Sequence, residues 1–435
     1  MLKFSKEVVI MKDLNVKNCF LPADILLPDF DKVDGKKWSV IACDQFTSEK
    51  DYWDAAEKII GSSKSTLNLM IPEIYLEQSE DRIPLVHAKM EEYLKSVLIC
   101  NPESMIYLER VQSDGRLRRG IVGMVDLEKY DYTKGSQSLI RATEGTVLSR
   151  IPPRVAVRRE APIELPHVIL LVDDPEKTVV EPLSVKKNDF KKAYDFELML
   201  GSGSVKAYFI DKDSQKEIAS ALEKLISPDK IVEKYGSADV APLLFAVGDG
   251  NHSLATAKAA YEEVKCKIGE EAAKSSLASY ALAEVENLHD DTLEFEPIYR
   301  ILLGADEKAL TDALVKYVDT LKGDAPEQKI ILVGKDGDKE ICVPAPVQQL
   351  AVGTLQEFLD NYLEAHPEIE IDYIHGEDSL RSLSEKDGVL GFLFDGMQKD
   401  ELFKSVIFDG SLPRKTFSMG LAKDKRFYIE CRKIK

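Results

Sequence analysis

The segment 242–268 constrains the fold most strongly, because an apolar strand runs through a glycine-rich turn into a long helix. Residues 242–247 (PLLFAV) form an apolar run typical of a buried strand. The turn GDGNHS (248–253) follows, and a helix is expected from about 252 to 268, with apolar residues at helical spacing. Such a strand–turn–helix unit predicts a mixed α/β (α+β) fold.

The turn has the chemistry of an anion site. The first N–H groups of a helix have no intrahelical partner, and the helix dipole places partial positive charge beside them. Gly248 and Gly250 would allow close approach of the backbone to a phosphate. His252 could donate to a phosphate oxygen, and Asp249 could hold a metal ion or accept a proton. The alternative is a helix capped by Asn251 above a plain tight turn.

Other elements are expected on both sides of this unit. Strands are predicted at 38–43, 104–111, 117–126, 166–173 and 204–211, and helices at 82–99, at 213–226 and from Ser48 onward. After residue 301, helices and strands alternate in a manner typical of a small α/β layer. We therefore expect a main mixed α/β domain over 1–300, a small α/β domain over 301–400, and C-terminal strands over 401–435 that return to the main domain.

Composition limits the function classes. The chain has 435 residues, a net charge of −18 and 44% apolar residues, so its surface repels nucleic acid. No apolar run is long enough to span a membrane, and the segment that starts at Met1 lacks the apolar region of a secretory signal. Six scattered cysteines without a C-x-x-C pair are typical of a reducing compartment. A cytoplasmic protein is expected, and monomer and homodimer both remain open.

Basic residues gather at two places in this acidic chain. Residues 141–160 contain five arginines, among them Arg141, Arg150 and Arg154, against Glu144 and one further glutamate. The tail from residue 414 onward is also basic. Such islands indicate a small anionic ligand, although a solvated face is an equal alternative.

A third candidate group follows the predicted strand 38–43. Asp44, Gln45 and Thr47 lie at its exit, where polar side chains of α/β sheets often face a ligand. They are therefore expected to bind substrate. Ser48 is most simply the N-cap of the helix that follows.

The turn and its surroundings resemble known families. GDGNHSLATAKA resembles the D-G-H-H-R motif of the ParB/sulfiredoxin superfamily, whose loop binds nucleotide phosphates and some of whose members are kinases of free serine. The chain as a whole resembles the domain-of-unknown-function 1015 family, nearly end to end. The blocks that carry this resemblance are ADILLP (23–28), WSVIACDQFTSEKDYW (38–53), IRATEGTVLSRIPPR (140–154), LEFEPIYR (293–300) and LPRKTFSMG (412–420). The resemblance implies a ParB/sulfiredoxin-like phosphate-binding core within the larger domain.

The sequence departs from these motifs at three positions. Ser253 stands where the superfamily has the closing arginine, Asn251 replaces the first histidine, and Tyr299 stands where the family often has histidine. Another basic residue would therefore have to contact the phosphate in place of this arginine. The candidates lie in family-like blocks: Arg141, Arg150, Arg154, Arg300 and Lys415.

The resemblance implies a small-molecule phosphotransferase, most plausibly a kinase of free L-serine with a nucleotide or pyrophosphate donor. Glu144 or Asp249 would take the hydroxyl proton, with His252 as a further catalytic residue and Mg²⁺ held at Asp249. The phosphates would contact Gly248, Gly250, Asn251 and Ser253. Two alternatives remain: a nucleotide-binding or nucleotide-hydrolysing regulator without an amino-acid acceptor, and a non-catalytic protein in which the turn is only structural.

Overall fold

The structure, a computed structural model, describes residues 19–435; the first 18 residues, within which the absence of a signal sequence was inferred, lie outside this range. The chain divides into two compact units. Unit 1 comprises residues up to Ala142, Thr146–Leu293 and Leu421–Lys435, and unit 2 comprises Thr143–Gly145 and Glu294–Gly420. Each unit is described by itself. Within residues 19–435 no helix is both long and apolar enough to cross a membrane.

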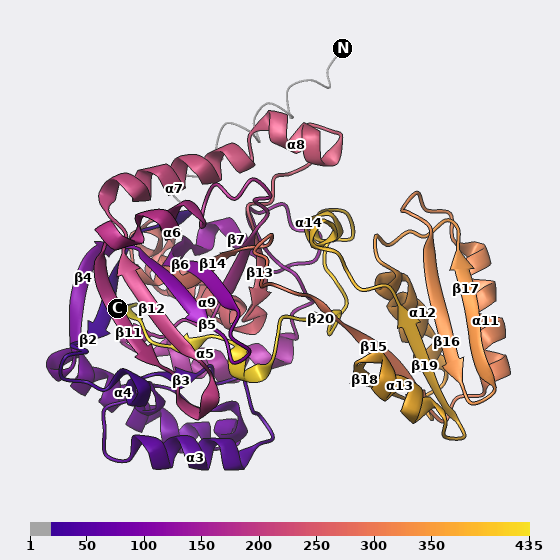
Figure 1. The fold of residues 1–435 in the computed structure, drawn as a ribbon, viewed down its shortest axis with the longest axis horizontal. Coiled ribbons are helices and arrows are strands. Elements are labelled where there is room, and N and C mark those ends of the chain that lie inside the picture. Colours follow the sequence, from indigo (N-terminus) through magenta and orange to yellow (C-terminus); the bar gives the residue numbers. More distant parts are fainter. Residues whose placement is uncertain (1–18) are drawn as a thin grey trace. The chain divides into compact units, whose positions relative to one another are not determined.

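Unit 1 is built on a large mixed sheet (Figure 1). Within the described residues its strands follow the order β11 (Lys191–Glu197), β12 (Ser204–Phe209), β5 (Ile106–Val111), β6 (Leu117–Asp126), β14 (Tyr280–Asn287), β10 (Ile169–Val172), β13 (Phe245–Asp249), β8 (Ile140–Ala142) and β7 (Tyr130–Asp131), with β1 (Phe20–Leu21) beside β6. β13 is antiparallel to β10 and parallel to β8. The predicted mixed α/β class is therefore confirmed.

Two smaller sheets complete unit 1. One has the order β4 (Leu98–Ser104), β2 (Ala23–Pro28), β22 (Cys431–Lys433) and β9 (Ile163–Glu164), and the other pairs β21 (Phe427–Tyr428) with β3 (Val40–Ile41). The last residues of the chain thus pair with strands near its beginning. The helices of unit 1 are α2 (Gly35–Trp38), α3 (Lys50–Ile60), α4 (Ser79–Ser96), α5 (Ile151–Arg159), α6 (Pro182–Lys186), α7 (Lys212–Leu225), α8 (Pro228–Tyr235), α9 (Asn251–Ile268) and α10 (Glu270–Lys274).

The large sheet is buried on both faces. Alternate residues of one strand point into different cores: Ile106 and Leu108 into one, and Tyr107 into the other. The first core includes Trp38 and the second includes Tyr261 of α9. In Figure 1, α3 and α4 lie at one end of unit 1, and α7 and α8 lie at the other. This two-faced burial fixes the position of β13 and of the turn that leaves it.

Unit 2 has its own antiparallel sheet and its own helices. Within the described residues the strand order is β17 (Gly337–Val343), β16 (Gln328–Gly334), β19 (Val389–Phe394), β15 (Glu296–Leu303) and β18 (Glu370–His375), with β20 (Phe417–Ser418) beside β15. Its helices are α11 (Glu307–Thr320), α12 (Ala351–Ala365), α13 (Glu377–Ser384) and α14 (Lys399–Phe408). The alternation predicted after residue 301 is present.

Two local predictions were wrong. The strand expected over 38–43 is reduced to β3, because Trp38 closes a short helix capped by the Asp34 side chain. The helix expected from Ser48 begins at Lys50, and its N-cap, Glu49, makes no side-chain capping bond. Just before α3 the Phe46 ring stacks on the Tyr52 ring, with 3.8 Å between the ring centres.

Candidate functional site

The turn after β13 has the strand–turn–helix geometry that the sequence predicts. Gly250 is the N-cap of α9 and has left-handed backbone angles, φ 77° and ψ 28°. A Cβ at this position would lie 3.1 Å from Cα of Val168, so glycine is required on two grounds. Asn251 is the first helical residue rather than the cap, and its Nδ2 donates to the carbonyl of Val247 at 3.4 Å. The expectation of a helix capped by Asn251 is therefore wrong, and no side chain caps this end.

The first turn of α9 carries His252 and Ser253. The Nε2 atom of His252 accepts the backbone N–H of Val147 at 3.4 Å, and its carbonyl accepts the hydroxyl of Thr256 at 2.7 Å. These contacts hold the His252 backbone and orient its ring. A helix of 18 residues adds its dipole to this end, which favours an anion.

Asp249 lies at the end of β13 and already has partners. One of its oxygens accepts the N–H of Gly250 at 3.0 Å, and the other lies 3.4 Å from Nζ of Lys425. Among residues 19–435 no group of three or more His, Cys, Asp or Glu side chains is arranged to hold a metal ion. Magnesium, however, is usually held by one or two carboxylates together with substrate phosphates. Asp249 alone fits that pattern only if a bound nucleotide supplies the remaining oxygens.

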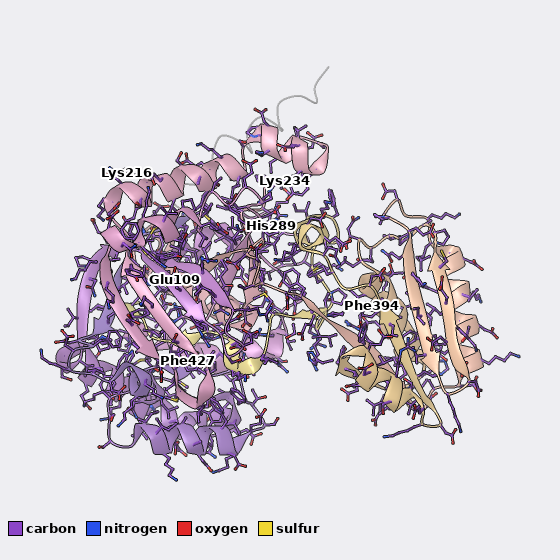
Figure 2. The ribbon with its side chains drawn as sticks, viewed as in Figure 1. Glu109, Lys216, Lys234, His289, Phe394 and Phe427 are labelled. Atoms are coloured by element: carbon purple, nitrogen blue, oxygen red, sulfur yellow. The ribbon has the colours of Figure 1, made fainter. Side chains whose placement is uncertain are left out.

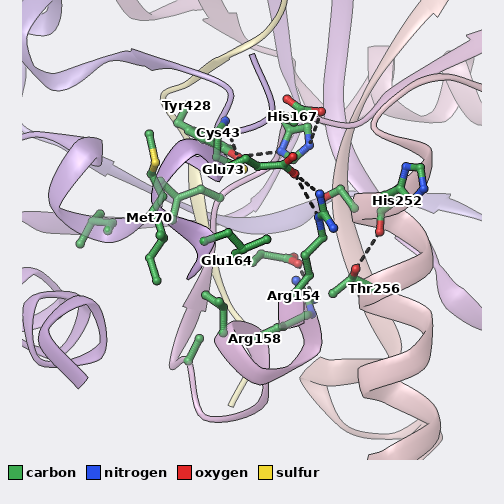
Figure 3. A pocket seen from close by; sticks show the side chains of 18 of the residues that line it. Cys43, Met70, Glu73, Arg154, Arg158, Glu164, His167, His252, Thr256 and Tyr428 are labelled. Carbon is green, nitrogen blue, oxygen red and sulfur yellow. Dashed lines mark hydrogen bonds and ion pairs between the residues drawn. The ribbon is translucent and has the colours of Figure 1, made fainter. Parts of the chain in front are cut away.

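A cavity of about 160 Å³ opens beside this helix end (Figure 3). Its apolar wall is formed by Leu69, Met70, Ile71, Leu76, Met90, Val157, Ala161, Ile163 and Leu165. Its polar wall is formed by Cys43, Asp44, Glu73, Arg154, Arg158, Glu164, His167, His252, Ser253, Thr256 and Tyr428. In Figure 3, Arg154 and Glu73 lie between Met70 and His252. The cavity therefore combines a helix N-terminus, arginines, carboxylates and an apolar surface.

Two arginines reach the cavity from one face of α5. Arg154 and Arg158 are four residues apart, and α5 packs against α9. Arg154 donates from Nε to an oxygen of Glu73 at 3.1 Å, with a second, shorter contact from its terminal nitrogen. Arg158 pairs with Glu164 at 2.5 Å, and Glu164 also accepts from Arg432 at 2.6 Å. Burial opposes ionisation of Glu164, yet the two arginines lower its pKa, so it is a carboxylate.

Asp44 differs from the other carboxylates because its ion-pair partner is a histidine. Its Oδ2 lies 3.6 Å from Nε2 of His167, and Gln45 donates to its Oδ1 at 3.1 Å. The other nitrogen of His167, Nδ1, lies 2.8 Å from the hydroxyl of Tyr428. That hydroxyl also contacts Sγ of Cys43 at 3.1 Å. Burial is the main cause that raises the pKa of Cys43 to about 12, which keeps the thiol protonated.

The structure brings some of the predicted residues together. Asp44, Arg154, His252 and Ser253 line one cavity. Gly248 and Asp249 are the last residues of β13, Gly250 makes the turn, and Asn251 begins α9. Gln45 lies behind Asp44, and Thr47 is exposed outside the lining.

Two arginines of the same basic island lie elsewhere in unit 1. Arg141 is buried on β8 and donates to the backbone carbonyls of Ser138, Ala241 and Pro242 at 2.8–3.1 Å. These contacts give it a structural role, and burial lowers its pKa to about 10. Arg150 is exposed and does not line the cavity.

Three predicted residues belong to unit 2. Glu144 forms an isolated β-bridge with Leu412. Arg300 is completely buried, and its guanidinium lies over the rings of Tyr373 and Phe394, the latter labelled in Figure 2. It donates to the backbone carbonyls of Arg414 and Lys415 at 3.1 and 3.0 Å. Lys415 is exposed, with Nζ 4.5 Å from the centre of the Tyr373 ring.

Sequence reasoning missed several residues of the cavity. Glu73, Arg158, Glu164, His167 and Tyr428 come from different segments and form no local motif. Only the i, i+4 spacing of Arg154 and Arg158, within a proline-started helix, could have indicated a shared face. Nothing near His167 in sequence indicates its partners, Asp44 and Tyr428.

No curated protein matches the sequence. A solved free serine kinase in complex with AMP is 13% identical, with a TM-score of 0.36, over 72% of this chain and 91% of that one. A conserved hypothetical protein from Pyrococcus furiosus is 12% identical, with a TM-score of 0.33, over 72% and 94%. SbnI from Staphylococcus aureus, with a C-terminal truncation, is 9% identical, with a TM-score of 0.32, over 69% and 83%.

All three TM-scores are below 0.5, and no statement about the activity of this chain follows from them. A family model gives a firmer result, because it matches residues 28–362, which is more than half of the chain. The matched range includes both the turn 248–253 and most of the cavity wall. The chain therefore belongs to the DUF1015 family of proteins of unknown function.

Proposed function

We propose that this chain is a small-molecule phosphotransferase that moves a phosphoryl group from a nucleotide to the hydroxyl of a free amino acid, with L-serine as the acceptor. One observation carries the proposal. The first turn of α9 opens into a cavity that also contains the guanidinium of Arg154 and the carboxylate of Asp44. An anion site, a cation and a proton acceptor in one cavity are the parts that phosphoryl transfer needs.

The donor phosphates would bind at the N-terminus of α9, against His252 and Ser253. Arg154 would exchange Glu73 for a phosphate oxygen and so replace the arginine that the superfamily motif has at position 253. The apolar wall around Met70 and Met90 offers a surface for a nucleobase, which pyrophosphate lacks. This supports a nucleotide rather than pyrophosphate. The free serine kinase structure contains AMP, but its similarity to this chain is too low to support a nucleotide donor here.

Asp44 is the carboxylate best suited to accept the hydroxyl proton. Glu73 and Glu164 also line the cavity, but each is paired with an arginine. In the proposed step the acceptor O–H bond breaks and its proton passes to Asp44. The acceptor oxygen bonds to phosphorus, and the bond from phosphorus to the nucleotide breaks, leaving its electron pair on the nucleotide oxygen.

This assignment replaces the two proton acceptors expected from the sequence. Asp249 is bound to Lys425, and Glu144 belongs to unit 2. Asp249 instead would be the residue that holds Mg²⁺ beside the phosphates. Bound there, the ion would neutralise negative charge on the donor oxygens.

Thermal melting with ATP, ADP or pyrophosphate, each with Mg²⁺, tests the binding step, because a ligand of the native state raises Tm by mass action. We expect a shift of several degrees with a nucleotide and its loss in His252→Ala. Mass spectrometry after incubation with L-serine tests the transfer, and L-alanine, which lacks the hydroxyl, is the control. Phosphoserine formation is the expected result. Nucleotide binding or hydrolysis without phosphoserine would indicate the alternative, a nucleotide-binding regulator, and no shift with any ligand would reject both.

A further inference from the structure

Three side chains from distant segments form a continuous array on the cavity wall. Asp44 follows β3, His167 precedes β10, and Tyr428 ends β21. The distances are 3.6 Å from Asp44 Oδ2 to His167 Nε2 and 2.8 Å from His167 Nδ1 to the Tyr428 hydroxyl. His167 is 7% exposed and Tyr428 is 3% exposed, so neither side chain is free to rotate away. We propose that His167 and Tyr428 are positioning residues that hold Asp44 as the proton acceptor of the proposed phosphotransfer. The inference rests on the proposed function.

The array favours one tautomer of His167, with the proton on Nε2. A carboxylate accepts hydrogen bonds only, so Nε2, which faces Asp44, must be the protonated nitrogen for the pair to attract. Nδ1 of a neutral ring is then an acceptor, and the Tyr428 hydroxyl gives its single proton to Nδ1 rather than to Sγ of Cys43. The protonated Cys43 thiol can then donate to the hydroxyl oxygen across their 3.1 Å contact. The opposite tautomer would place an unprotonated nitrogen against a carboxylate. The hydroxyl oxygen still accepts the N–H of Cys43 at 3.3 Å, so Tyr428 itself is anchored by the backbone next to Asp44.

The same histidine lies against the phosphate turn. A Cβ on Gly250 would be 3.4 Å from Cδ2 of His167. The His167 ring therefore lies close to both Gly250 and Asp44, although no hydrogen bond of the ring holds the turn. At 3.6 Å the Asp44–His167 contact is an ion-pair distance rather than a hydrogen bond. Such contacts often shorten when the substrate binds, and we expect this one to do so.

The first test reads the tautomer directly and does not require activity. We expect ¹⁵N NMR of histidine-labelled protein to show His167 with a proton on Nε2 and an unprotonated, hydrogen-bonded Nδ1. Tyr428→Phe removes only the hydroxyl, and we expect it to shift the Nδ1 resonance. A matched control is Tyr130→Phe, since the Tyr130 hydroxyl is buried without a hydrogen-bond partner and lies outside the cavity. A proton on Nδ1 with Nε2 bare would overturn the proposal.

The second test separates positioning from folding by kinetics. Because His167 and Tyr428 act through Asp44, Tyr428→Phe and His167→Gln should lower kcat for phosphoserine formation by about tenfold or more. The Kd for nucleotide and the KM for the donor should stay within about twofold, because the phosphate turn is unchanged. Asp44→Asn should lower kcat further, by about a hundredfold or more.

The outcomes distinguish this inference from the function on which it rests. If the wild-type protein makes no phosphoserine, the proposed function fails and the role of the array in catalysis fails with it. If the wild-type protein transfers phosphate and both His167→Gln and Tyr428→Phe keep full kcat, only the positioning role is overturned. If these variants lose nucleotide affinity in proportion to kcat, the residues are structural supports of the cavity and the proposal is also rejected.

Discussion

Arg154 and Glu73 form an ion pair on the cavity wall, although 81 residues separate them in the chain. Both side chains are largely buried, with 17% and 18% of their surface exposed. In this pair the Glu73 carboxylate holds the guanidinium of Arg154, to which the proposed donor phosphate would bind. A bound nucleotide would therefore compete with Glu73 for Arg154. Glu73 should lower the affinity for nucleotide, and Arg154 should raise it.

The first prediction follows from this competition. Glu73→Gln removes the competing charge, so the affinity for Mg²⁺-nucleotide should rise by roughly tenfold. Arg154→Ala should weaken binding by roughly ten- to a hundredfold, the usual range for lost hydrogen bonds to a charged group. Isothermal titration calorimetry measures both values. The matched control is the more exposed pair of Arg159, which shares α5 with Arg154, and Glu263 of α9, where Glu263→Gln should change nothing. Weaker binding in Glu73→Gln would show that Glu73, rather than Arg154, contacts the ligand.

A second prediction concerns the turn itself. Gly250 and Gly236 both have left-handed backbone angles, but a Cβ on Gly236 would meet open space, whereas one on Gly250 would press on Val168. Each substitution by alanine costs about 1–2 kcal/mol for the backbone conformation. Gly250→Ala should lower the free energy of unfolding by roughly a further 1 kcal/mol or more, because its Cβ would also press on Val168. Urea unfolding, with tryptophan fluorescence as the signal, reports on unit 1, because unit 1 contains both tryptophans, Trp38 and Trp53. Equal losses in the two variants would contradict the close approach at Gly250.

A third prediction concerns pH. Burial, opposed by Arg118 and reinforced by Glu284, raises the pKa of Glu286 from about 4.5 to about 8. The folded state therefore binds a proton that the unfolded state releases, and the stability this proton contributes is present below pH 4.5 and is lost as pH rises to about 8. The free energy of unfolding of unit 1 should fall across this range. In Glu286→Gln the decline should be weaker, because a neutral side chain replaces the protonated carboxyl. An unchanged pH slope in Glu286→Gln, measured by urea unfolding at pH 5.5 and pH 8.5, would contradict the raised pKa.

Much of the fold could be predicted because its signals are local. The turn after β13, the hairpin of β5 and β6 and the helix α7 follow from apolar spacing and glycine placement within a few residues. The start of α3 was misplaced because the helix begins at Lys50 without a side-chain cap, whereas the sequence signal relied on Ser48 as the capping residue. Edge strand β11 was missed because its exposed face carries charged residues that read as a loop.

The candidate site was predictable only in part, for a similar reason. The turn could be found because strand, glycines and helix are adjacent in sequence. The array of Asp44, His167 and Tyr428 depends on pairing between β21 and β3, which joins residues nearly 400 positions apart. The structural role of Arg141 could not be predicted either, since two of its three backbone acceptors, the carbonyls of Ala241 and Pro242, are 100 and 101 residues away. A charged side chain in a basic island gives no indication of whether its donors face solvent or the backbone.

Nucleotide binding by Ser253→Glu tests whether the phosphates bind at the N-terminus of α9. A glutamate in the first turn of α9 suits the helix dipole, so folding and Tm should be preserved or slightly improved. The same carboxylate would face the cavity and repel the donor phosphates. Ser220→Glu adds the same charge on the exposed side of α7 and serves as the control. Titration calorimetry with Mg²⁺-ATP and Mg²⁺-ADP should find wild-type affinity in Ser220→Glu and at least a tenfold loss of affinity in Ser253→Glu. Equal affinity in the two variants would show that the phosphates do not bind at the N-terminus of α9.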